Sequence, residues 1–450
     1  MTTKYIVLKF GGSSQCPQGM DVILNKIVSY TNSGNKVILV ISAVGKTTNN
    51  LYSIINCEKD MFQIIYDNHK KLCESIGINF APVKKILENL KNDMEIYISQ
   101  PFTDITQQKL KIISYGEYMS SLIVHNFLKK NFVDNFYLNS HLFVKNKSAS
   151  YTIDADTLNI KGEFWCDLEV LSKLLQYDYN VFVTQGFIAS TCDNKYCVLT
   201  RSGSNTSASL IASALNAERL EIWTDVNGLY TGDPRKIPSA KIIPYIKYSV
   251  CQEAAAMGSQ IIHPFSIKPC EEKHIPIHIK NTFSPDEVGT VINGYMTNDE
   301  KYNVHLIAQQ GNVTVFKIIS PDMWEGYGFV QEIFNVFKEE KIDVNIITTS
   351  QFEITTTTNE KSTKKIDRVK EELGQKYKVH VTSGCAIVSV IANNVSHNKA
   401  ITRIHELVVD EIEGQIYIIH FGSNNMTLSY VVDEIHANKL ASLLHDKLIN

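Results

Sequence analysis

Four short runs of apolar residues, separated by helix-like stretches, constrain the fold of this chain most strongly. The runs cover residues 6–9, 36–41, 180–185 and 220–224. Helical patterns occur near residues 19–31, 48–78, 82–99, 115–131 and 205–217. Because buried strands that alternate with helices are typical of a parallel sheet covered by helices, we predict that architecture through about residue 295.

The chain changes character after residue 292. Two sets of segments there share the order strand, helix, strand: residues 313–319, 327–340 and 344–348, and then residues 386–391, 398–411 and 416–421. This order predicts two copies of a small β-α-β unit, roughly 70 residues each. Residues 355–366 are rich in threonine and lysine, so we expect a mobile loop without chemistry of its own.

Composition and charge exclude several classes of partner. Hydrophobic residues make up 44% of the 450 residues, charged residues 20%, and the formal net charge is -3. A chain of this length has room for two or three domains, and it has no basic excess of the kind that binds nucleic acid. No apolar run reaches the roughly 18 residues that a membrane span needs. We therefore expect small-molecule partners, with no nucleic acid and no membrane.

The cysteines indicate the compartment. Nine of them are scattered along the chain, and no two form a C-x-x-C pair. This pattern is typical of free thiols in a reducing environment. The chain also enters its first strand soon after Met1, so we expect no signal peptide and a cytoplasmic protein.

The first strand runs directly into Lys9-Phe10-Gly11-Gly12-Ser13-Ser14. Glycines allow backbone N–H groups to approach oxyanions closely, and a lysine offsets their charge, so the segment suits phosphate. The patterns of a P-loop and of a dinucleotide-binding turn are both absent, which argues against P-loop NTPases and Rossmann dehydrogenases. A glycine turn with a purely structural role remains an alternative.

Polar loops follow the other predicted strands. Residues 42–49 (SAVGKTTN) come after the second strand, and residues 200–206 (TRSGSNT) place Arg201 in a Ser/Gly turn before a helix for which Ser204 and Asn205 are good N-caps. Residues 223–235 (WTDVNGLYTGDPR) contain an acidic residue, an aromatic residue and an Asp-Pro-Arg turn, all of which follow the fourth strand. The alternative for each loop is a purely structural role as a turn or a helix cap. Glu117 lies at a predicted helix start, where we expect it to act as a capping residue.

Taken together, these motifs resemble the aspartate kinases of the amino acid kinase family. The segments that carry the resemblance occur in the expected order: VLKFGGSS, SAVGKTTNNL, SYGEYMSS, TRSGSNTSAS, WTDVNGLYTGDPRKIPSA, GSQIIHP and PDEVGTVI. The C-terminal repeats are similar to the paired ACT domains of the monofunctional members, with GFVQEIFNVFKEEKIDVNIITTS similar to their effector-binding segment.

The resemblance implies a fold and an assembly. Residues 1–295 would form an α/β amino acid kinase domain, a three-layer α/β/α sandwich around a mainly parallel sheet. Residues 303–380 and 381–450 would form two α+β ACT domains of the ferredoxin-like type. The protein would assemble through these ACT domains as a homodimer or a higher homo-oligomer.

The implied activity is the ATP-dependent phosphorylation of the β-carboxylate of L-aspartate. The product would be 4-phospho-L-aspartate, the first step toward lysine, threonine and methionine. Mg²⁺ would travel with ATP, held mainly by phosphates and water, and no dedicated metal site is expected. The alternatives are a catalytically weakened, amino-acid-binding regulatory subunit and a related amino acid kinase with another carboxylate substrate.

The resemblance also implies roles for individual residues. The catalytic residues would be Lys9, Gly11, Gly12 and Asp225. The residues that bind aspartate would be Thr48, Asn49, Glu117, Arg201, Ser204 and Asn205. The residues that bind ATP would be Lys9, Ser13, Thr224, Asp225, Tyr230, Asp233, Arg235 and Gln260. The residues that bind an amino acid effector would be Met323, Phe329, Val330, Asn345, Thr349, Ser350 and Gln351.

Within these sets, three side chains have a defined part. Lys9 would neutralise the transferring phosphoryl group, Arg201 would clamp the α-carboxylate of the substrate, and Glu117 would recognise its α-ammonium group. Asn205 stands where family members usually have an aspartate, so the KM for aspartate is expected to rise. Gln260 stands where many members have a lysine.

The effector is less defined by the resemblance. Asn345 and Gln351 stand where lysine-sensitive relatives have acids. Their loss weakens the case for a cationic effector. Lysine, threonine and no effector therefore all remain open.

Overall fold

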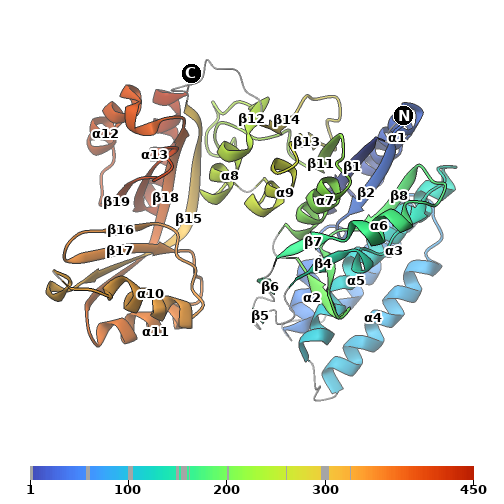
Figure 1. The fold of residues 1–450 in the computed structure, drawn as a ribbon, viewed down its shortest axis with the longest axis horizontal. Coiled ribbons are helices and arrows are strands. Elements are labelled where there is room, and N and C mark those ends of the chain that lie inside the picture. The colour runs from blue at the N-terminus through green and yellow to red at the C-terminus, as the bar shows by residue number, and fades with distance from the viewer. Residues whose placement is uncertain are drawn as a thin grey trace. The chain divides into compact units, whose positions relative to one another are not determined.

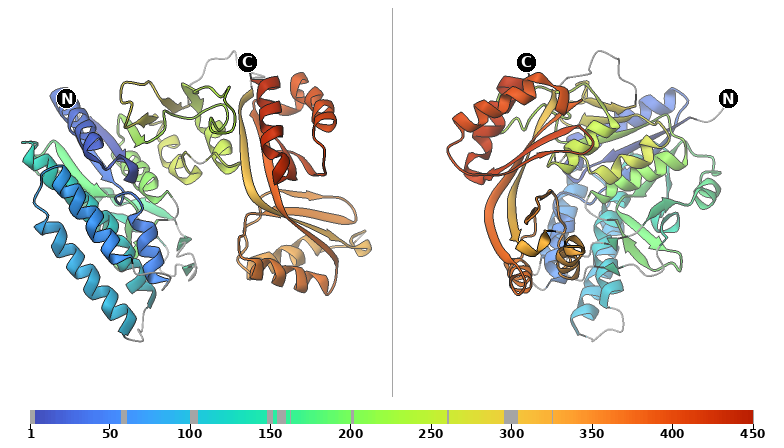
Figure 2. Two further views of the ribbon diagram at one scale, coloured as in Figure 1. Left: turned by 180° about the vertical axis from the view of Figure 1, so that it is seen from behind. Right: turned by 60° about the vertical axis from the view of Figure 1, so that its left-hand side comes forward.

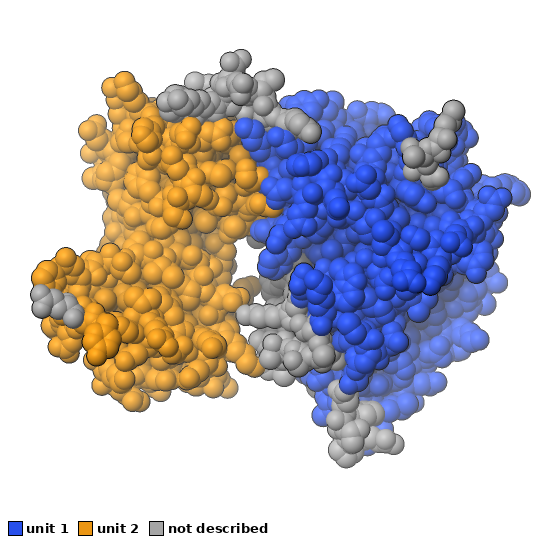
Figure 3. Space-filling model, in the orientation of Figure 1, with its two compact units in different colours: residues 1–229, 242–248, 261–296 blue, residues 230–241, 249–260, 297–450 orange. Residues whose placement is uncertain are grey.

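The computed structural model describes residues 4–56, 61–99, 105–147, 152–153, 160–161, 163–199, 202–259, 261–294, 304–324 and 326–449, with the backbone alone at 152–153 and 160–161. Contacts divide the chain into two compact units, which Figure 3 shows in different colours. The first unit comprises residues 1–229, 242–248 and 261–296. The second comprises residues 230–241, 249–260 and 297–450.

The first unit is built on an eight-stranded sheet (Figure 1). The strand order is β12-β14-β13-β11-β1-β2-β8-β3. The strands are β1 (Tyr5–Phe10), β2 (Lys36–Ile41), β3 (Phe136–Tyr137), β8 (Val181–Gln185), β11 (Arg219–Thr224), β12 (Tyr245–Lys247), β13 (Ile277–Asn281) and β14 (Thr290–Asn293). The four predicted strands, β11, β1, β2 and β8, are neighbours and pair in parallel, as expected. The pair of β13 and β14 is antiparallel.

Helices cover this sheet because its central strands are apolar on both faces. β1 and β2 are buried at all but their first position and β8 throughout, and α1, α5 and α7 contact them. The helices up to residue 294 are α1 (Pro17–Asn32), α2 (Thr47–Ile55), α3 (Phe62–Ser75), α4 (Ala81–Ser99), α5 (Ile105–Lys130), α6 (Leu168–Leu174), α7 (Gly203–Ala214), α8 (Tyr248–Ala256) and α9 (Lys268–Glu271). The predicted helix-covered parallel sheet is confirmed.

Short strands in the middle of the first unit form two further sheets that the sequence pattern did not predict. A four-stranded sheet has the order β10-β9-β4-β7, and β5 pairs with β6. The strands are β4 (Val144–Asn146), β5 (Thr152–Ile153), β6 (Ile160–Lys161), β7 (Phe164–Cys166), β9 (Ile188–Thr191) and β10 (Tyr196–Val198). With two to four residues each, these strands are too short to show a clear period.

The second unit contains a six-stranded antiparallel sheet of order β16-β17-β15-β18-β20-β19, seen from two further sides in Figure 2. The strands are β15 (Val304–Ile319), β16 (Ile347–Thr349), β17 (Glu353–Thr358), β18 (Lys378–Ala392), β19 (Ile416–Phe421) and β20 (Thr427–Asp433). β15 and β18 pair along almost their whole length. Because they are continuous through both halves of the sheet, the predicted boundary at residue 380 stays a prediction.

Two pairs of helices pack on different parts of this sheet. α10 (Phe329–Glu339) and α11 (Thr363–Gly374) share a core with β15 and β17 that includes Phe316, Ile333 and Val369. α12 (Lys399–Glu411) and α13 (Glu434–Leu448) share a core with β18 and β20. Each half therefore contains the predicted combination of strands and helices.

One prediction in this region is wrong. Residues 355–366 were expected to form a mobile loop, but Thr355–Thr358 lie in β17 and α11 begins at Thr363. The four threonines are buried, and their hydroxyl groups are hydrogen-bonded. Thr356 Oγ1 donates to the carbonyl of Ile346 at 2.9 Å and Thr358 Oγ1 to that of Asp343 at 2.7 Å, while Thr357 Oγ1 accepts from the N–H of Ile346 at 3.1 Å. A β-branched side chain whose hydroxyl group is satisfied is a good strand residue, which polarity alone does not reveal.

Eight cysteines lie in the described part of the chain, and each of them is a free thiol. Cys57 lies outside the described residues. Among the described helices, none combines the length and the apolar composition that crossing a membrane requires.

Candidate active site

The candidate site lies in the first unit, where four parallel strands end together. Phe10 at the end of β1 is paired with Ile41 at the end of β2 and with Trp223 near the end of β11. Ile41 is paired in turn with Gln185 at the end of β8. The loops that follow these strands therefore leave from one edge of the sheet, which is where parallel sheets bind ligands.

Lys9 is the cation at this edge. Its side chain is 8% exposed, and burial lowers the pKa of its ammonium group to about 8, an effect that the nearby charge of Asp225 partly offsets. Asp225 itself is exposed, directly after β11, and its Oδ1 accepts a hydrogen bond of 3.2 Å from Thr224 Oγ1. The structure thus brings Lys9 near Thr224 and Asp225, which are distant from it in the sequence.

Gly11 and Gly12 allow the loops after β1 and β2 and the end of β11 to approach closely. The N–H of Gly11 donates to the carbonyl of Trp223 at 3.0 Å, and the N–H of Gly45 donates to that of Gly12 at 3.1 Å. A Cβ added to Gly12 would lie 2.5 Å from the carbonyl oxygen of Ala43, so any other residue at this position would force the backbone to shift. The chemistry that the sequence suggested for this turn is thus accompanied by a packing role.

The serines after the glycines have different surroundings. They belong to the 3-10 turn η1 (Gly12–Ser14). Ser13 is exposed, as a residue that contacts a ligand can be. Ser14 is buried, and its Oγ lies 2.6 Å from Oγ1 of Thr282, so it has a structural partner.

Glu117 corrects one expectation about its position. It was read as a capping residue at a helix start, but α5 begins at Ile105, so Glu117 lies in the helix interior. Its side chain is 3% exposed; Oε1 accepts a hydrogen bond of 3.3 Å from the N–H of Ala43, and Thr48 bonds to the same carboxyl group. Oε2 is buried and has no hydrogen-bond partner among the described residues. Burial raises the pKa of this carboxyl group to about 8.

The residues at the start of α2 add further polar groups near Glu117. Thr48 and Asn49 lie in the first turn of α2, Thr48 half-buried and Asn49 exposed. A buried carboxyl group that keeps a free oxygen beside such a turn is suited to a cationic partner, since an ammonium group would satisfy both its charge and its lone pairs.

Ser204 and Asn205 lie in the first turn of α7. The helix begins at Gly203 with Ser202 as its N-cap, so the expected capping role of Ser204 and Asn205 is wrong. Asn205 is 7% exposed, and its Oδ1 has no partner within the described part of the chain. A Cβ on Gly186 would lie 2.5 Å from that of Ser204, so the helix start is packed against the end of β8. Thr200 and Arg201 lie outside the described residues.

The other residues that are expected to bind the nucleotide belong to the second unit. Tyr230 is half-buried, and Asp233 and Arg235 form a two-pronged ion pair, with Arg235 Nε and Nη2 each 2.9 Å from a different carboxylate oxygen. The guanidinium group lowers the pKa of Asp233. Gln260 lies outside the described residues.

Sequence reasoning missed two residues at the edge of the sheet. The Gln15 amide donates a hydrogen bond to the carbonyl of Ser42, while its Oε1 is buried and unpartnered among the described residues. Thr184, at the end of β8, has a buried hydroxyl group without a described partner. Thr184 lies near the end of a predicted strand and could have been found by that position, whereas no pattern marks Gln15.

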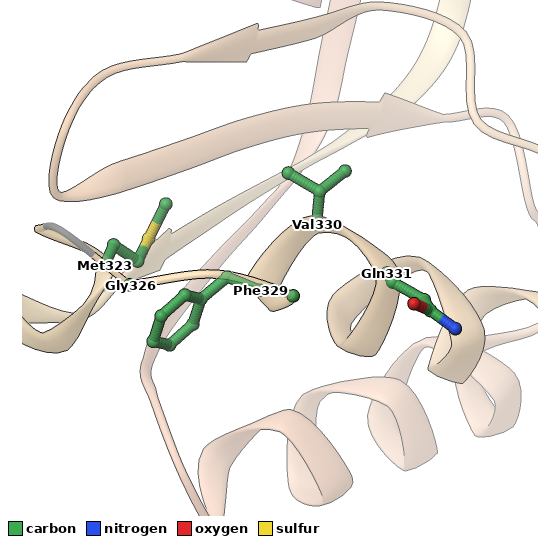
Figure 4. A pocket seen from close by; sticks show the side chains of 6 residues that line it. Met323, Gly326, Phe329, Val330 and Gln331 are labelled. Carbon is green, nitrogen blue, oxygen red and sulfur yellow. The ribbon is translucent and has the colours of Figure 1, made fainter.

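The expected effector residues lie in the second unit. Met323, Phe329 and Val330 line a pocket of 490 Å³ together with Gly326, Gly328 and Gln331, at the start of α10 (Figure 4). The other expected residues do not line it: Asn345, Thr349, Ser350 and Gln351. The side-chain amide of Asn345 donates to Asn359 Oδ1 at 2.9 Å, and Thr349 lies in the edge strand β16.

No metal site is visible in the part of the chain that the structure describes. No group of three or more His, Cys, Asp or Glu side chains is placed there to hold an ion.

Known proteins resemble this chain over most of its length. Aspartokinase 2, chloroplastic, of Arabidopsis thaliana is 27% identical over 86% of this chain and 74% of its own length. Lysine-sensitive aspartokinase 3 of Escherichia coli (strain K12) is 26% identical over 88% of each chain.

Solved structures share the fold. The Escherichia coli aspartokinase III complex with aspartate and ADP has a TM-score of 0.82 at 23% identity, covering 99% of this chain and 100% of that one. The aspartate kinase of Clostridium acetobutylicum has a TM-score of 0.77 at 21% identity, and the match covers 98% of this chain and 100% of that one. The model of the amino acid kinase family matches residues 4–281, more than half of the chain. This match, together with the parallel sheet and the polar groups at its edge, shows that the chain belongs to the amino acid kinase family.

Proposed function

We propose that this protein is an aspartate kinase, which transfers the γ-phosphoryl group of ATP to the β-carboxylate of L-aspartate. The observation that carries the proposal is the pair of buried ionisable groups, one basic and one acidic, at one sheet edge. Lys9 is a cation whose pKa burial has lowered, and Glu117 is an acid with one free buried oxygen. A substrate that has both an anionic group to be phosphorylated and an ammonium group matches these two sites.

The chemistry requires two anions to come within bonding distance. Catalysis of such a transfer is mostly positioning and neutralisation of charge. Lys9 would neutralise the transferring phosphoryl group, and Gly11 and Gly12 would let the backbone approach it. Asp225, whose charge acts on Lys9, would help to keep Lys9 protonated.

The substrate would be held by its other two charged groups. Glu117 would bind the α-ammonium group, with Thr48 and Asn49 beside it, and Ser204 and Asn205 would complete this side of the pocket. Arg201 is proposed to clamp the α-carboxylate, on the resemblance of its motif alone.

We propose that two sets of residues bind the nucleotide. The support for these roles is the similarity of the motifs that contain the residues. Ser13 follows β1, Thr224 is the last residue of β11, and Asp225 comes directly after it. Tyr230, Asp233, Arg235 and Gln260 come later in the chain. Mg²⁺ would come with the phosphates of ATP, because Mg²⁺ keeps several waters and needs few protein ligands. The glycine turn and Lys9 fit a phosphate group, and the proposal needs no protein cage for the ion.

The activity is tested by trapping the acyl phosphate with hydroxylamine. Purified protein with ATP, Mg²⁺ and L-aspartate is expected to form aspartyl hydroxamate, with L-glutamate as the matched control substrate. Turnover with glutamate but not aspartate would indicate a related amino acid kinase. Binding of aspartate without turnover at saturation would indicate a regulatory subunit, the alternative that Asn205 favours because it lacks the expected carboxylate.

Regulation by an amino acid, lysine or threonine, is proposed for the two ACT domains, residues 303–380 and 381–450. The support is the pocket at the start of α10 and the sequence similarity of this segment. Titration of each amino acid into the hydroxamate assay tests it. Inhibition by one of them identifies the effector, and inhibition by neither removes the proposal.

A homodimer or higher homo-oligomer is proposed through the same region. Trp324 and Phe352 are about half exposed and stacked with their ring centres 5.6 Å apart, and Tyr327 is 98% exposed. Ile347 in the edge strand β16 is also exposed. Edge strands and exposed aromatic clusters favour association with a second copy. Light scattering on wild type and Trp324→Ala tests this, with a shift of the variant toward monomer expected.

A cytoplasmic location is also proposed. The free thiols among the described residues support it, because free thiols are typical of a reducing compartment.

A further inference from the structure

Residues 230–241 belong to the second unit, although they contain three of the residues proposed to bind the nucleotide. The backbone of Thr231 anchors this segment on both sides: its N–H donates to the carbonyl of Lys241 at 2.8 Å, and its carbonyl accepts from Ile307 in β15 at 2.8 Å. Ile237 is 2% exposed and shares the apolar core of α12 and α13. The segment is thus part of the same folded body as the proposed ACT domains.

A chain of hydrogen bonds joins this segment to α13 through a buried histidine. Thr231 Oγ1 accepts from the N–H of Lys241 at 2.9 Å and lies 2.8 Å from His445 Nε2. His445 Nδ1 lies 3.2 Å from Ser239 Oγ, which donates to Asp446 Oδ1 at 2.9 Å. His445 is 2% exposed, and both of its ring nitrogens have a partner within residues 230–241.

In the form of the ring that carries a single proton, the chemistry of the partners decides which nitrogen holds it. Ser239 gives its only hydrogen to Asp446, so the bond from Nδ1 must be donated by His445. Nε2 is then the acceptor, and Thr231 donates to it while it accepts from Lys241. In this series of hydrogen bonds, each hydroxyl group and the imidazole ring donate one bond and accept one. The direction of each bond therefore determines the direction of the next.

We propose that His445 is a positioning residue for nucleotide binding, which holds the segment that contains Tyr230, Asp233 and Arg235 in place through Thr231 and Ser239. The inference rests on the proposed function. Its consequence is that the position of the C-terminal turn of α13 and the affinity for ATP are coupled. Coupling of this kind is reciprocal, so nucleotide binding must also stabilise that turn.

Two substitutions of His445 separate its two hydrogen bonds. Glutamine places an acceptor near the Nε2 position and keeps the bond from Thr231, whereas asparagine places a donor near the Nδ1 position and keeps only the bond to Ser239. His445→Asn is expected to raise the KM for ATP about three- to tenfold, the range that follows from losing one neutral hydrogen bond. The KM for aspartate and kcat at saturation should stay within about twofold, and His445→Gln should remain close to wild type.

Val369→Ala is the control for a loss of stability alone. Val369 is fully buried in the core between α11 and the sheet, a cluster that contains neither His445 nor any residue of 230–241. The substitution should lower the Tm without changing the KM for ATP. An equal change in both KM values in His445→Asn, an unchanged KM for ATP, or the same change in Val369→Ala would each overturn the proposal.

A second measurement uses the full-length protein without turnover. Hydrogen exchange of residues 440–448 should slow when ADP binds to wild type and should change much less in His445→Asn. The Kd for ADP, measured by calorimetry, should rise in step with the KM for ATP. If wild type bound ADP but showed no aspartate-dependent turnover, the proposed function would fail while these two measurements still decided the role of His445. Equal ADP affinity and equal exchange in both proteins would refute that role.

Discussion

The N–H of Ala43 donates a hydrogen bond of 3.3 Å to Oε1 of Glu117, while Oε2 of the same carboxyl group has no partner among the described residues. Burial raises the pKa of this group to about 8. The free protein therefore holds an acid that is largely protonated at neutral pH. An ammonium group placed beside Oε2 would favour the ionised form of Glu117. Ionised Glu117 therefore favours binding of aspartate, whereas protonated Glu117 favours the stability of the free protein.

Glu117→Gln is expected to stabilise the free protein at alkaline pH. A glutamate in the unfolded chain has a pKa of about 4.3, well below the folded value. The folded state therefore binds the proton more tightly, and the stability that comes from this group is complete below about pH 4 and is lost as the pH rises through 8. Glutamine stays neutral, so the Tm of the variant should exceed that of wild type by about 5 °C at pH 8.5.

Thermal unfolding in a pH series provides the control for this prediction. Near pH 4 the two proteins should have nearly the same Tm, because both side chains are then uncharged. The variant should also have a KM for aspartate at least about tenfold higher, from the loss of a charge-assisted hydrogen bond. A Tm difference that does not depend on pH would contradict the ionisation argument.

The pH profile of kcat/KM for aspartate is expected to be bell-shaped with a maximum near pH 8. The proposed reaction uses the charged form of Lys9, whose pKa burial lowers to about 8, and the ionised form of Glu117, whose pKa burial raises to about 8. Activity should rise with pH as Glu117 ionises and fall again as Lys9 loses its proton, about tenfold per pH unit on each side.

Each limb of that profile has its own control. Glu117→Gln should abolish the acidic limb and keep the alkaline one. At saturating ATP, the alkaline limb of kcat should move to higher pH, because bound phosphates favour the charged lysine. A profile without pH dependence between about 6.5 and 9.5 would exclude these two residues as the titrating groups.

Gly12→Ala and Gly11→Ala form a matched pair of substitutions in the first loop. A Cβ at position 12 would lie 2.5 Å from the carbonyl oxygen of Ala43 and 3.0 Å from that of Gly45, both in backbone. Gly12→Ala should therefore cost about 1–3 kcal/mol of the free energy of unfolding. A Cβ at position 11 meets nothing closer than 3.4 Å, but it lies 3.5 Å from Lys9 Nζ. Gly11→Ala should fold normally and lose activity.

Urea unfolding and hydroxamate formation measured together distinguish the two variants. Equal stability of both would show that the contact at Gly12 relaxes easily. Full activity of Gly11→Ala would show that no reacting group passes close to Lys9 on that side.

Asn205→Asp is expected to lower the KM for aspartate about tenfold, since a carboxylate would add a charge-assisted bond to the substrate ammonium group. Asn205 is 7% exposed, and its Oδ1 has no partner within the described residues, so a charge there is unpaired without substrate. The Tm of the free variant should therefore fall, and aspartate should restore it. Asn205→Ala serves as the control and should not lower the KM. An unchanged KM in Asn205→Asp would rule out contact with the ammonium group.

Much of the first unit was predictable because its strands are continuous apolar runs. β1, β2, β8 and β11 carry this signal, and they are the neighbours whose ends build the site. The prediction was wrong where polarity was taken as a sign of a loop, at Thr355–Thr358, and where a helix start was placed too late, before Glu117. In both cases the side chain's partner lies elsewhere in the sequence, and a local pattern does not contain it.

The site shows the same division. Lys9, Gly11, Gly12 and Asp225 were recognisable because each lies at the end of an apolar strand or within two residues after it. Gln15 and Thr184 were missed because their importance comes from buried atoms left without a partner, and burial is a property of the packed molecule.

The sequence alone determined the order of strands and helices, the polar loops that follow the strands, and the family whose motifs these loops match. Those features depend on residues that are neighbours in the sequence and on the short spacing at which apolar residues recur. Only the tertiary structure decided that Ala43 meets Glu117, that His445 meets Thr231, and that burial brings the pKa values of Lys9 and Glu117 to about 8. Contacts over such separations, and the loss of water that shifts a pKa, arise only when whole elements pack together.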